Sequence, residues 1–404
     1  MEKNKSAWLG AREAVELLGV SRATLYAYVS RGRIRSESTG GKDRRRRYAR
    51  DDLERLVART RERRNPEKAA EQALHFGLPI LESAITLIAD DHIYYRGRDA
   101  SELARTASIA DVAALLWTGT ADGSAFAAPA RSAAPRRVSA SATPKSFVPA
   151  AQAALAQAAA ADPLAYDLRP RAVAQTGWRI LSLLARVATG GAPAGATLDA
   201  TLAAAWEVPR AAELVRAALV LCADHELNVS AFTARCVASA GSSPYGVVIA
   251  GLAALEGTRH GGTTARVEAA WDSRKRARDL RGALTERLKR GETIEGFGHR
   301  LYARGDPRAA VLLAMLPKGK AAAFAHELVA AARGVLGEAP TVDFALVALA
   351  RSLGLPDGTA LTLFALGRTM GWIGHAIEQY AEGTVIRPRA KYVGERPAPV
   401  TSER

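Results

Sequence analysis

The chain has 404 residues, a formal net charge of +15 and an apolar content of 48%, so it can hold two or three domains and bury a sizeable core. No apolar run is as long as a membrane span, and the first residues do not read as a signal peptide. Two cysteines cannot form a disulfide framework or a four-cysteine zinc site. These totals exclude a membrane protein, and we expect a cytoplasmic one.

The positive charge is concentrated at the front of the chain. Residues 1–66 contain 18 Lys and Arg against nine Asp and Glu. Such a concentration of basic residues predicts a polyanionic partner for this segment, with nucleic acid as the first candidate. The milder positive excess in the rest of the chain suits small anionic substrates.

Residues 11–30 read as two short helices joined by a tight turn. Gly19 is suited to end the first helix, and Ser21 is suited to cap the second, which runs to about Ser30. The apolar positions predicted to be buried are Ala14, Leu17, Leu18, Leu25 and Val29. The positions predicted to point outward on the second helix are Arg22, Thr24 and Tyr28. This pattern predicts a helix-turn-helix.

The next stretch, "STGGKDRRRRYARDDLERL", predicts a tight turn at Gly40-Gly41, a basic strand or wing, and a helix capped by Asp51-Asp52. The order of elements over residues 7–58 resembles the MerR-like winged helix-turn-helix. That resemblance implies a helix near the DNA major groove and a wing that reaches phosphate. The candidate DNA contacts are Arg22, Thr24, Arg44, Arg45, Arg46 and Arg47. The alternative is a basic face on a protein-binding module.

The charged residues 59–73 read as a linker, and a different domain follows. Residues 109–118 predict an amphipathic helix that ends at Gly119. Residues 121–165 are rich in Ala, Pro and Ser and predict a variable loop followed by a weak helix. Beyond residue 170, helical patterns alternate with Gly and Pro breaks, and alternating apolar and polar runs are absent. The second domain is therefore predicted to be all-α.

Three of the seven histidines lie in unusual settings. His225 opens "DHELNVSAFTAR", His260 precedes two glycines in "EGTRHGG", and "GFGHRLYARGDPR" contains His299 and Arg308. None of them has metal-ligand spacing, so no metal is expected. The remaining histidines show no chemical partner in the sequence and are predicted to be structural: His75, His92, His326 and His375.

Two further stretches contain charged residues in apolar surroundings. Asp343 follows a proline break and enters an apolar helix, which requires a partner or a functional purpose. Arg368 lies on a helix flanked by glycines, and Arg387 and Arg389 flank Pro388. Guanidinium groups are suited to two-pronged recognition of carboxylates.

The order of these motifs, from "DHELNVSAFTAR" to "IRPRAKYVG", resembles citrate synthase and its methylcitrate synthase relatives over roughly residues 76–404. The segments "YYRGRDASELA" and "DVAALLWTG" resemble the opening of that enzyme. The resemblance implies an all-α fold with two lobes, preceded by the winged head and linker at residues 1–66. The implied body spans 67–404, with a large lobe at about 67–263 and 349–404 and a small lobe at about 264–348.

The resemblance also implies a reaction, in which acetyl-CoA, oxaloacetate and water give citrate and CoA. Asp343 would take the proton from the acetyl methyl group, His260 would bind the thioester oxygen, and His299 would bind and protonate the ketone oxygen. The residues that would hold the oxaloacetate carboxylates are His225, Arg308, Arg368 and Arg387. Arg387 would come from the partner subunit of a homodimer. CoA would lie against Ile294, Gly296, Phe297 and Gly298 as a substrate, and no cofactor is expected.

The chain departs from the family pattern after two of these motifs. Thr263-Thr264-Ala265 stand where Ala-Asn-Glu is common, and Asp343 is followed by Phe344-Ala345-Leu346, where Phe-Tyr-Ser-Gly is common. The acyl group is therefore open, and 2-methylcitrate synthesis from propionyl-CoA is one alternative. A second alternative is a transcription regulator that senses a metabolite through the body. A third is a head that binds protein and positions the enzyme.

Overall fold

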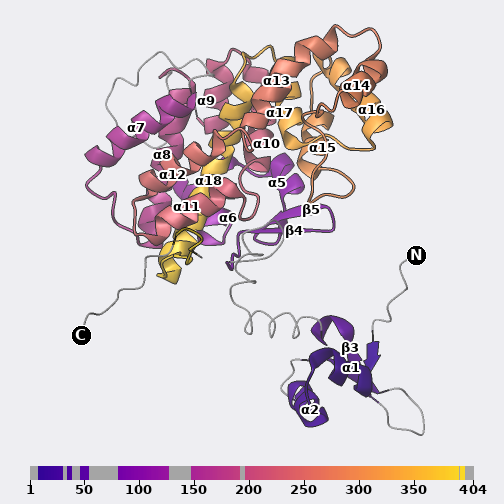
Figure 1. The fold of residues 1–404 in the computed structure, drawn as a ribbon. Helices are drawn as coiled ribbons and strands as arrows, with labels where there is room; N and C mark the ends of the chain where they lie inside the picture. The colour runs from indigo at the N-terminus through magenta and orange to yellow at the C-terminus, as the bar shows by residue number, and fades with distance from the viewer. Residues whose placement is uncertain are drawn as a thin grey trace, which may run out of the picture. The chain divides into compact units, whose positions relative to one another are not determined.

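The computed structural model describes residues 8–30, 34–38, 46–53, 81–126, 147–191, 196–390 and 392–395. The chain divides into two compact units, residues 1–82 and 83–404 (Figure 1). They are called the head and the body. Within the described ranges, no helix is both long and apolar enough to cross a membrane.

The head is a pair of helices against a small antiparallel sheet. The strands β1 (Trp8–Gly10), β2 (Ser36–Ser38) and β3 (Arg46–Ala49) pair in the order β1-β3-β2. The helices α1 (Ala11–Leu18) and α2 (Arg22–Ser30) form the helix-turn-helix. The buried side chains that hold these elements together are Leu9, Ala14, Leu25, Ile34, Tyr48 and Leu53.

The turn between α1 and α2 has the predicted chemistry. Gly19 adopts a left-handed φ of 62° and ends α1. The Ser21 hydroxyl accepts a hydrogen bond from the Thr24 backbone N–H at 3.2 Å, which caps α2. The prediction that Tyr28 points outward is wrong, because its half-buried ring packs against the head core. A small domain buries little of its apolar surface, so an aromatic ring at the edge of the core adds useful burial.

The acidic pair after β3 behaves differently from the prediction. The next helix has begun by Arg50, so Asp51 and Asp52 lie in its first turn and do not precede it. The buried Asp52 carboxylate accepts hydrogen bonds from the Arg35 backbone N–H at 2.8 Å and from the Arg35 guanidinium. The predicted turn at Gly40-Gly41, the linker at 59–73 and His75 lie outside the described residues.

The body begins with a three-stranded antiparallel sheet that the sequence analysis did not predict. Its strands are β4 (Thr86–Ala89), β5 (His92–Tyr95) and β6 (Arg98–Asp99), in the order β4-β5-β6. These strands are too short to show an alternating pattern. Asp90 and Asp91 form the two-residue turn of the first hairpin, both with positive φ (52° and 62°).

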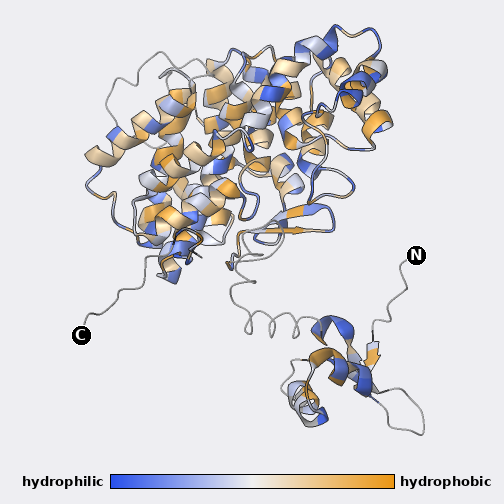
Figure 2. Cartoon of the chain, in the orientation of Figure 1, coloured by the Kyte–Doolittle hydropathy of each residue, from blue (hydrophilic) through white to orange (hydrophobic). Residues whose placement is uncertain are grey.

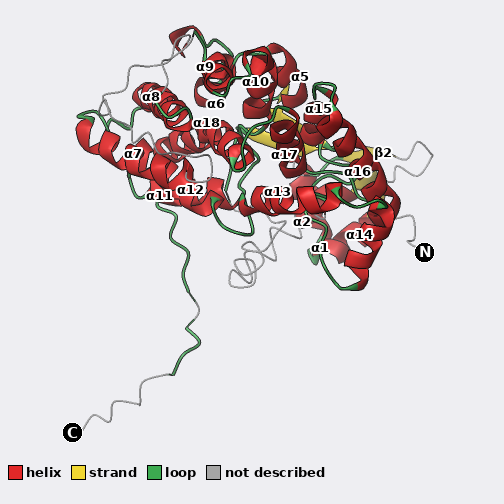
Figure 3. Cartoon of the chain, turned by 90° about the horizontal axis from the view of Figure 1, so that it is seen from above, coloured by secondary structure: helices red, strands yellow, loops and turns green. Residues whose placement is uncertain are grey.

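All other regular elements of the described body are helical, as predicted, and helices dominate the view in Figure 3. The α-helices are α5 (Ala100–Thr106), α6 (Ile109–Thr118), α7 (Phe147–Ala161), α8 (Pro170–Ala188), α9 (Leu198–Ala205), α10 (Ala212–Leu221), α11 (Val229–Ser239), α12 (Pro244–Leu255), α13 (Gly262–Lys275), α14 (Leu280–Lys289), α15 (Pro307–Ala314), α16 (Lys320–Leu336), α17 (Val342–Ser352) and α18 (Thr359–Glu382). Short 3₁₀ turns lie at Ser124–Phe126 and Pro209–Ala211.

Two of the predicted helices can be compared directly. α6 ends at Gly119, whose φ is 83°, as predicted. The weak helix predicted from "AALAQAAAA" is α7, which starts earlier, at Phe147, and buries Phe147, Val148 and Leu155. Residues 127–146, which include most of the predicted variable loop, lie outside the described ranges.

The long helix α18 passes through the middle of the body. It packs against helices from widely separated parts of the preceding chain, including α8, α10, α11, α12 and α17. Of its 24 residues, 19 are buried, so it is enclosed on nearly all sides (Figures 1 and 2). Polar side chains on such a helix must find partners inside the protein or serve a ligand.

Helices α14, α15 and α16 lie together at one end of the body, and α17 lies between them and α18 (Figure 1). α17 packs against α13, α15, α16 and α18. This arrangement brings the N-terminus of α17, the loop before α15, and the middle of α18 to one region. These three places hold Asp343, His299 with Arg308, and Arg368.

Candidate active site

His225 lies in the turn between α10 and α11. Its ring is buried, and Nε2 lies 3.0 Å from the Tyr302 hydroxyl. The following residue, Glu226, has a left-handed φ of 51°, which turns the chain sharply at this point. Burial, together with the nearby Arg308 and Arg368, holds the pKa of His225 well below its ordinary value. The imidazole is therefore neutral and serves as a hydrogen-bonding group.

His299 and Tyr302 come from the loop that precedes α15. The ring centres of His299 and His225 are 5.3 Å apart, and those of His299 and Tyr302 are 4.8 Å apart. Nδ1 of His299 accepts a hydrogen bond from the Leu301 backbone N–H at 3.2 Å. Burial, with a smaller contribution from Arg308, lowers the pKa of His299. In the resulting neutral ring the proton is on Nε2, so that atom is a hydrogen-bond donor.

Arg308, at the start of α15, is fixed by Asp306. The Asp306 carboxylate accepts from Nε of Arg308 at 2.9 Å and from Nη2 at 2.8 Å, and both side chains are buried. The same carboxylate accepts from the Val342 backbone N–H at 2.9 Å. Burial opposes the charge of Arg308, but Asp306 outweighs it and raises the pKa. Asp306 thus ties a fixed cation to the N-terminus of α17.

Arg368 is a buried cation without a full set of partners. Its Nε donates to the Cys222 carbonyl at 2.9 Å, and its guanidinium carbon lies 4.8 Å from the centre of the Phe364 ring. Neither Nη1 nor Nη2 has a hydrogen-bond partner among the described residues, although both are buried. A buried donor without a hydrogen-bond partner lowers stability by about 1–3 kcal/mol, and by more when the group is charged. A guanidinium fork held in this way is prepared for an anion.

His260 lies between α12 and α13. Its Nε2 is 2.8 Å from the Ser230 hydroxyl on α11, and its ring meets the Phe364 ring edge-on at 5.9 Å. Burial, with a contribution from Arg368, lowers the pKa of His260 to about 4. The ring is therefore neutral near pH 7. Phe364 lies one helical turn before Arg368, so His260 and Arg368 flank the same aromatic ring.

Asp343 lies in the first turn of α17, immediately after Val342. The residue is half-buried, and burial raises the pKa of its carboxyl to about 6. Arg308 opposes this rise, and the negative charge of Asp306 adds to it. A carboxylate with a raised pKa is a stronger base than an exposed one.

The structure thus gathers most of the predicted residues into one region. Direct contacts join His225, His299 and Arg308 through Tyr302. His260 joins Arg368 through Phe364, and Asp343 lies next to the backbone group that Asp306 binds. Arg387 is not in this group, because it is exposed on the segment after α18, which leaves the helical body in Figure 3.

The segment predicted to contact CoA packs against the chain leading to α17. Gly296 and Gly298 have positive φ, and their backbones are hydrogen-bonded to Thr341 N–H and to the Ala339 carbonyl. The side chains of Ile294 and Phe297 are buried, and Phe297 stacks on Phe344 with ring centres 5.0 Å apart. The segment is therefore tied directly to the helix that carries Asp343.

Several residues of this region were missed in the sequence analysis. Tyr302, Ser230 and Asp306 directly contact the predicted groups, although the sequence marks them only by nearness to the histidines and to Arg308. His375, for which the sequence showed no partner, has its Nε2 3.2 Å from Asp224. His92 likewise contacts Asp99 at 3.2 Å. These pairs join distant parts of the sequence or different strands, which no local pattern reveals.

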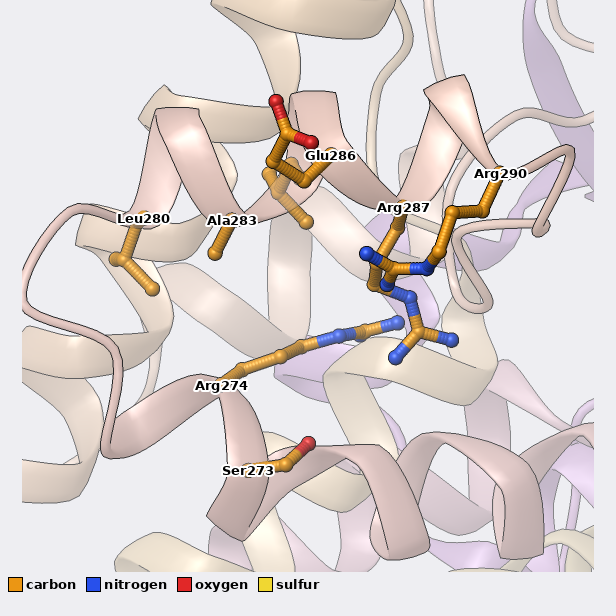
Figure 4. A pocket seen from close by; sticks show the side chains of 8 residues that line it. Ser273, Arg274, Leu280, Ala283, Glu286, Arg287 and Arg290 are labelled. Atoms are coloured by element: carbon orange, nitrogen blue, oxygen red, sulfur yellow. The ribbon is translucent and has the colours of Figure 1, made fainter.

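A surface cavity of about 250 Å³ lies beside α14 (Figure 4). Arg274, Arg287 and Arg290 line it. All three are paired with carboxylates, since Arg274 and Arg287 lie near Glu295 and both Arg287 and Arg290 lie near Glu292. None of the predicted catalytic residues lines this cavity. Among the described residues, no cluster of three His, Cys, Asp or Glu side chains could hold a metal ion.

The predicted DNA contacts that fall in the described head are exposed or partly exposed. Arg22 on α2 and Arg46 and Arg47 on β3 are exposed, and the half-buried Thr24 bonds to the Ser21 hydroxyl at 2.9 Å. Tyr26, with 52% of its surface exposed, is a further outward group on α2 that was not predicted. Arg44 and Arg45 lie outside the described residues.

Comparison with known families agrees with this geometry. Residues 74–389 match the family model for the C-terminal domain of citrate synthase. The chain belongs to the citrate synthase family. Residues 8–61 match a helix-turn-helix domain model, which accounts for the head.

Similar proteins of known name are citrate synthases and 2-methylcitrate synthases. This chain is 39% identical to the citrate synthase of Haloferax volcanii over 193 residues, which cover 46% of this chain and 51% of that protein. It is 34% identical to the 2-methylcitrate synthase of Shewanella oneidensis, over 45% of this chain and 50% of that one. The chain thus spans about half the length of the curated relatives it matches.

Solved structures extend the likeness in fold to most of the body. The citrate synthase of Thermotoga maritima has a TM-score of 0.64 and 24% identity, over 80% of this chain and 95% of that chain. The citrate synthase of Thermoplasma acidophilum, solved with carboxymethyl coenzyme A and oxaloacetate, has a TM-score of 0.69 and 23% identity, over 81% of this chain and 97% of that one. The citrate-synthase-like fold of the body is therefore shown.

Proposed function

We propose that this protein condenses a short acyl-CoA with oxaloacetate, with acetyl-CoA as the first candidate and propionyl-CoA as the alternative. The observation that carries the proposal is the group of two buried arginines and three neutral imidazoles in the region of Asp343. Relatives named as citrate synthases and as 2-methylcitrate synthases both match the chain, so the acyl group remains part of the proposal.

Oxaloacetate is a dianion with a ketone, and the cluster offers a group for each part. The unpaired fork of Arg368 and the fixed guanidinium of Arg308 are suited to its carboxylates. The Nε2–H of His299 can donate to the ketone oxygen and polarise the carbon that is attacked. Arg387 would add a further cation from the partner subunit of a homodimer.

Asp343 is proposed as the base that removes a proton from the acyl-CoA carbon next to the thioester. His260 would stabilise the enol that forms by donating a hydrogen bond to the thioester oxygen. The Ser230 hydroxyl donates to the Asn228 side-chain oxygen at 2.8 Å, so toward His260 it acts as the acceptor from Nε2–H. That arrangement places the imidazole proton on Nε2, and this N–H is the donor that the thioester oxygen would share with or take from Ser230.

The remaining steps follow from the same positions. The enol carbon attacks the ketone carbon, the ketone oxygen becomes the new hydroxyl near His299, and water then cleaves the thioester to release CoA. CoA would lie along the segment at Ile294, Gly296, Phe297 and Gly298, which joins the helix of Asp343. CoA acts here as a substrate, and the proposed proton transfers use side chains of this chain.

The test is release of free thiol from acetyl-, propionyl- and butyryl-CoA, each with and without oxaloacetate. The expected result is thiol release that requires oxaloacetate and prefers one acyl chain. Asp343→Asn should lower kcat by at least a hundredfold. No release from any of the three donors would contradict the proposal.

A second function is favoured by the head. The helix-turn-helix match and the exposed Arg22, Arg46 and Arg47 support binding to nucleic acid through phosphate contacts. A dimeric body would present two such heads to a palindromic site. Duplex DNA from the chain's own genome, retained on the protein in a salt-sensitive way and with or without oxaloacetate, would separate this function from protein binding by the head.

A further inference from the structure

The middle of α18 lies directly on the chain segment that leads to His225. Arg368, Gly371 and His375 recur at one-turn spacing and share one face of the helix. Arg368 donates to the Cys222 carbonyl, the Gly371 backbone N–H donates to the Ala223 carbonyl at 3.0 Å, and His375 meets the Asp224 side chain. Three successive turns of the helix thus hold three successive residues of the segment.

This approach is as close as a backbone can make. A Cβ on Gly371 would overlap the Ala223 carbonyl oxygen and Oδ1 of Asp224. A Cβ on Gly367 would lie 2.5 Å from the Leu219 carbonyl oxygen. The segment therefore has one available position against α18, set by contacts that tolerate no extra atom.

Asp224 is the polar centre of this contact. Its side chain is fully buried, with Oδ1 3.2 Å from Nε2 of His375 and Oδ2 accepting from the Thr86 hydroxyl at 2.6 Å. Its backbone carbonyl lies 3.3 Å from the buried Tyr95 hydroxyl. Burial acts to raise the pKa of Asp224, but His375 and Arg368 outweigh it, and the pKa is lowered. Asp224 is thus a buried carboxylate held from the sheet on one side and from α18 on the other.

The Asp224 carboxylate also stabilises the positive charge of Arg368. Burial lowers the pKa of Arg368, and Asp224 opposes that effect more than any other group. Because Nη1 and Nη2 have no partners among the described residues, Asp224 helps to keep this guanidinium charged before an anion arrives. Asp224 is also the residue immediately before His225, so it fixes the position of that ring.

We propose that Asp224 and His375 form a buried positioning pair that aims His225 and Arg368 at the same dicarboxylate. This inference rests on the proposed function, because the dicarboxylate is the oxaloacetate of that reaction. Neither residue needs to touch the substrate. The pair acts through Arg368, which lies two turns before His375 on α18. It also acts through the peptide bond that joins Asp224 to His225.

The test measures binding and turnover separately, with the full-length chain. Calorimetry gives the Kd for oxaloacetate, and the thiol assay gives kcat and both KM values. Asp224→Asn and His375→Leu are expected to raise the oxaloacetate Kd at least tenfold and to leave the KM for acyl-CoA within threefold. His375→Gln, which can keep a donor near Asp224, should stay within threefold of the unsubstituted chain. Thr86→Val is the milder variant, and we expect a Kd at least threefold higher.

Tyr245→Phe is the matched control for lost stability. It removes a hydrogen bond from the Tyr245 hydroxyl to Asp162, 2.9 Å long, in another part of the body. If Asp224→Asn, His375→Leu and Thr86→Val lower Tm as this control does but keep the oxaloacetate Kd within threefold, the pair is only structural and the inference is overturned.

Failure of the proposed function gives a different result. An unsubstituted chain that binds oxaloacetate but releases no thiol would overturn the condensation, and the Kd comparison would still decide the role of the pair. An unsubstituted chain that binds no oxaloacetate would overturn both.

Discussion

Asp343 combines a catalytic advantage with a cost in stability. Its pKa is raised to about 6 by burial, so the folded protein holds a proton there more tightly than the unfolded chain. Between the ordinary value of 3.8 and about 6, the native state binds more protons, and stability falls as the pH rises through that window. Above it, the ionised carboxylate is a competent base in an unfavourable setting.

This balance predicts that the substitution Asp343→Asn, which should lower kcat, raises stability at high pH. At pH 8, Asp343→Asn should raise the free energy of unfolding by up to about 3 kcal/mol, because it removes a charge at a carboxyl whose pKa is raised by burial to about 6. Below pH 4 the difference should vanish. Urea denaturation at both pH values measures it, and equal stabilities at pH 8 would contradict the assigned cause.

The same pKa predicts the pH dependence of turnover. Only the ionised Asp343 can accept a proton, so kcat/KM for acyl-CoA should rise tenfold per pH unit below about pH 6 and level off above it. His260, whose pKa is lowered to about 4, stays neutral over this range and does not contribute. A profile that is flat from pH 5 to 8 would count against Asp343 as the base.

The hairpin of β4 and β5 links two loops of the candidate site. Near its base, the Thr86 hydroxyl binds Asp224. At its tip, the Asp91 carboxylate accepts from the Arg304 backbone N–H at 3.2 Å and from Nε of Arg304 at 2.8 Å. Arg304 belongs to the loop that contains His299 and precedes α15. A small sheet that sequence patterns did not reveal therefore contacts both sides of the site.

Asp91→Asn tests this link with little change in fold. Asparagine tolerates the left-handed conformation at position 91, so Tm should stay within about 2 °C, while loss of the charge should raise the KM for oxaloacetate about twofold to fivefold. Asp90→Asn is the matched control, because Asp90 contacts Arg304 through its backbone carbonyl. The two variants should differ in KM at equal ionic strength, and an equal KM would argue against the link.

The close packing of α18 predicts that a glycine-to-alanine substitution changes stability in the opposite direction to the usual one. Alanine in place of glycine within a helix normally stabilises by up to about 1 kcal/mol. At Gly371 the added Cβ overlaps backbone and Asp224, so Gly371→Ala should destabilise by about 2–4 kcal/mol. Gly334→Ala in α16 is the control, because its Cβ meets only the end of the Arg281 side chain at 3.4 Å. Chemical denaturation of both variants measures the contrast.

The whole molecule combines a basic head with a citrate-synthase-like body. If the two units have separate partners, a change in the head should not affect the chemistry of the body. Arg46→Ala with Arg47→Ala should weaken retention of duplex DNA about tenfold at moderate salt and leave thiol release unchanged. Retention by filter binding at two salt concentrations measures the first effect. Loss of thiol release in the same variant would show that the units are coupled.

The sequence by itself determined the helix-turn-helix, the helical body and the positions of His225, His260, His299, Arg308, Asp343 and Arg368. Glycine caps, N-cap residues and helical spacing act over a few residues, so α1, α2 and α6 could be predicted from local pattern. The family resemblance could be found for the same reason, because each motif is a short continuous stretch of the sequence.

Only the tertiary structure decided which distant groups meet. Asp224 and His375 are 151 residues apart, and Thr86 is 138 residues from Asp224, yet the three form one buried network. Such pairs depend on how α18 packs against the turn before His225 and on a sheet too short to show a pattern. The raised pKa of Asp343 and the unpaired guanidinium nitrogens of Arg368 likewise arise from burial. Burial depends on how the whole body packs, so the sequence identifies these residues but does not predict these properties.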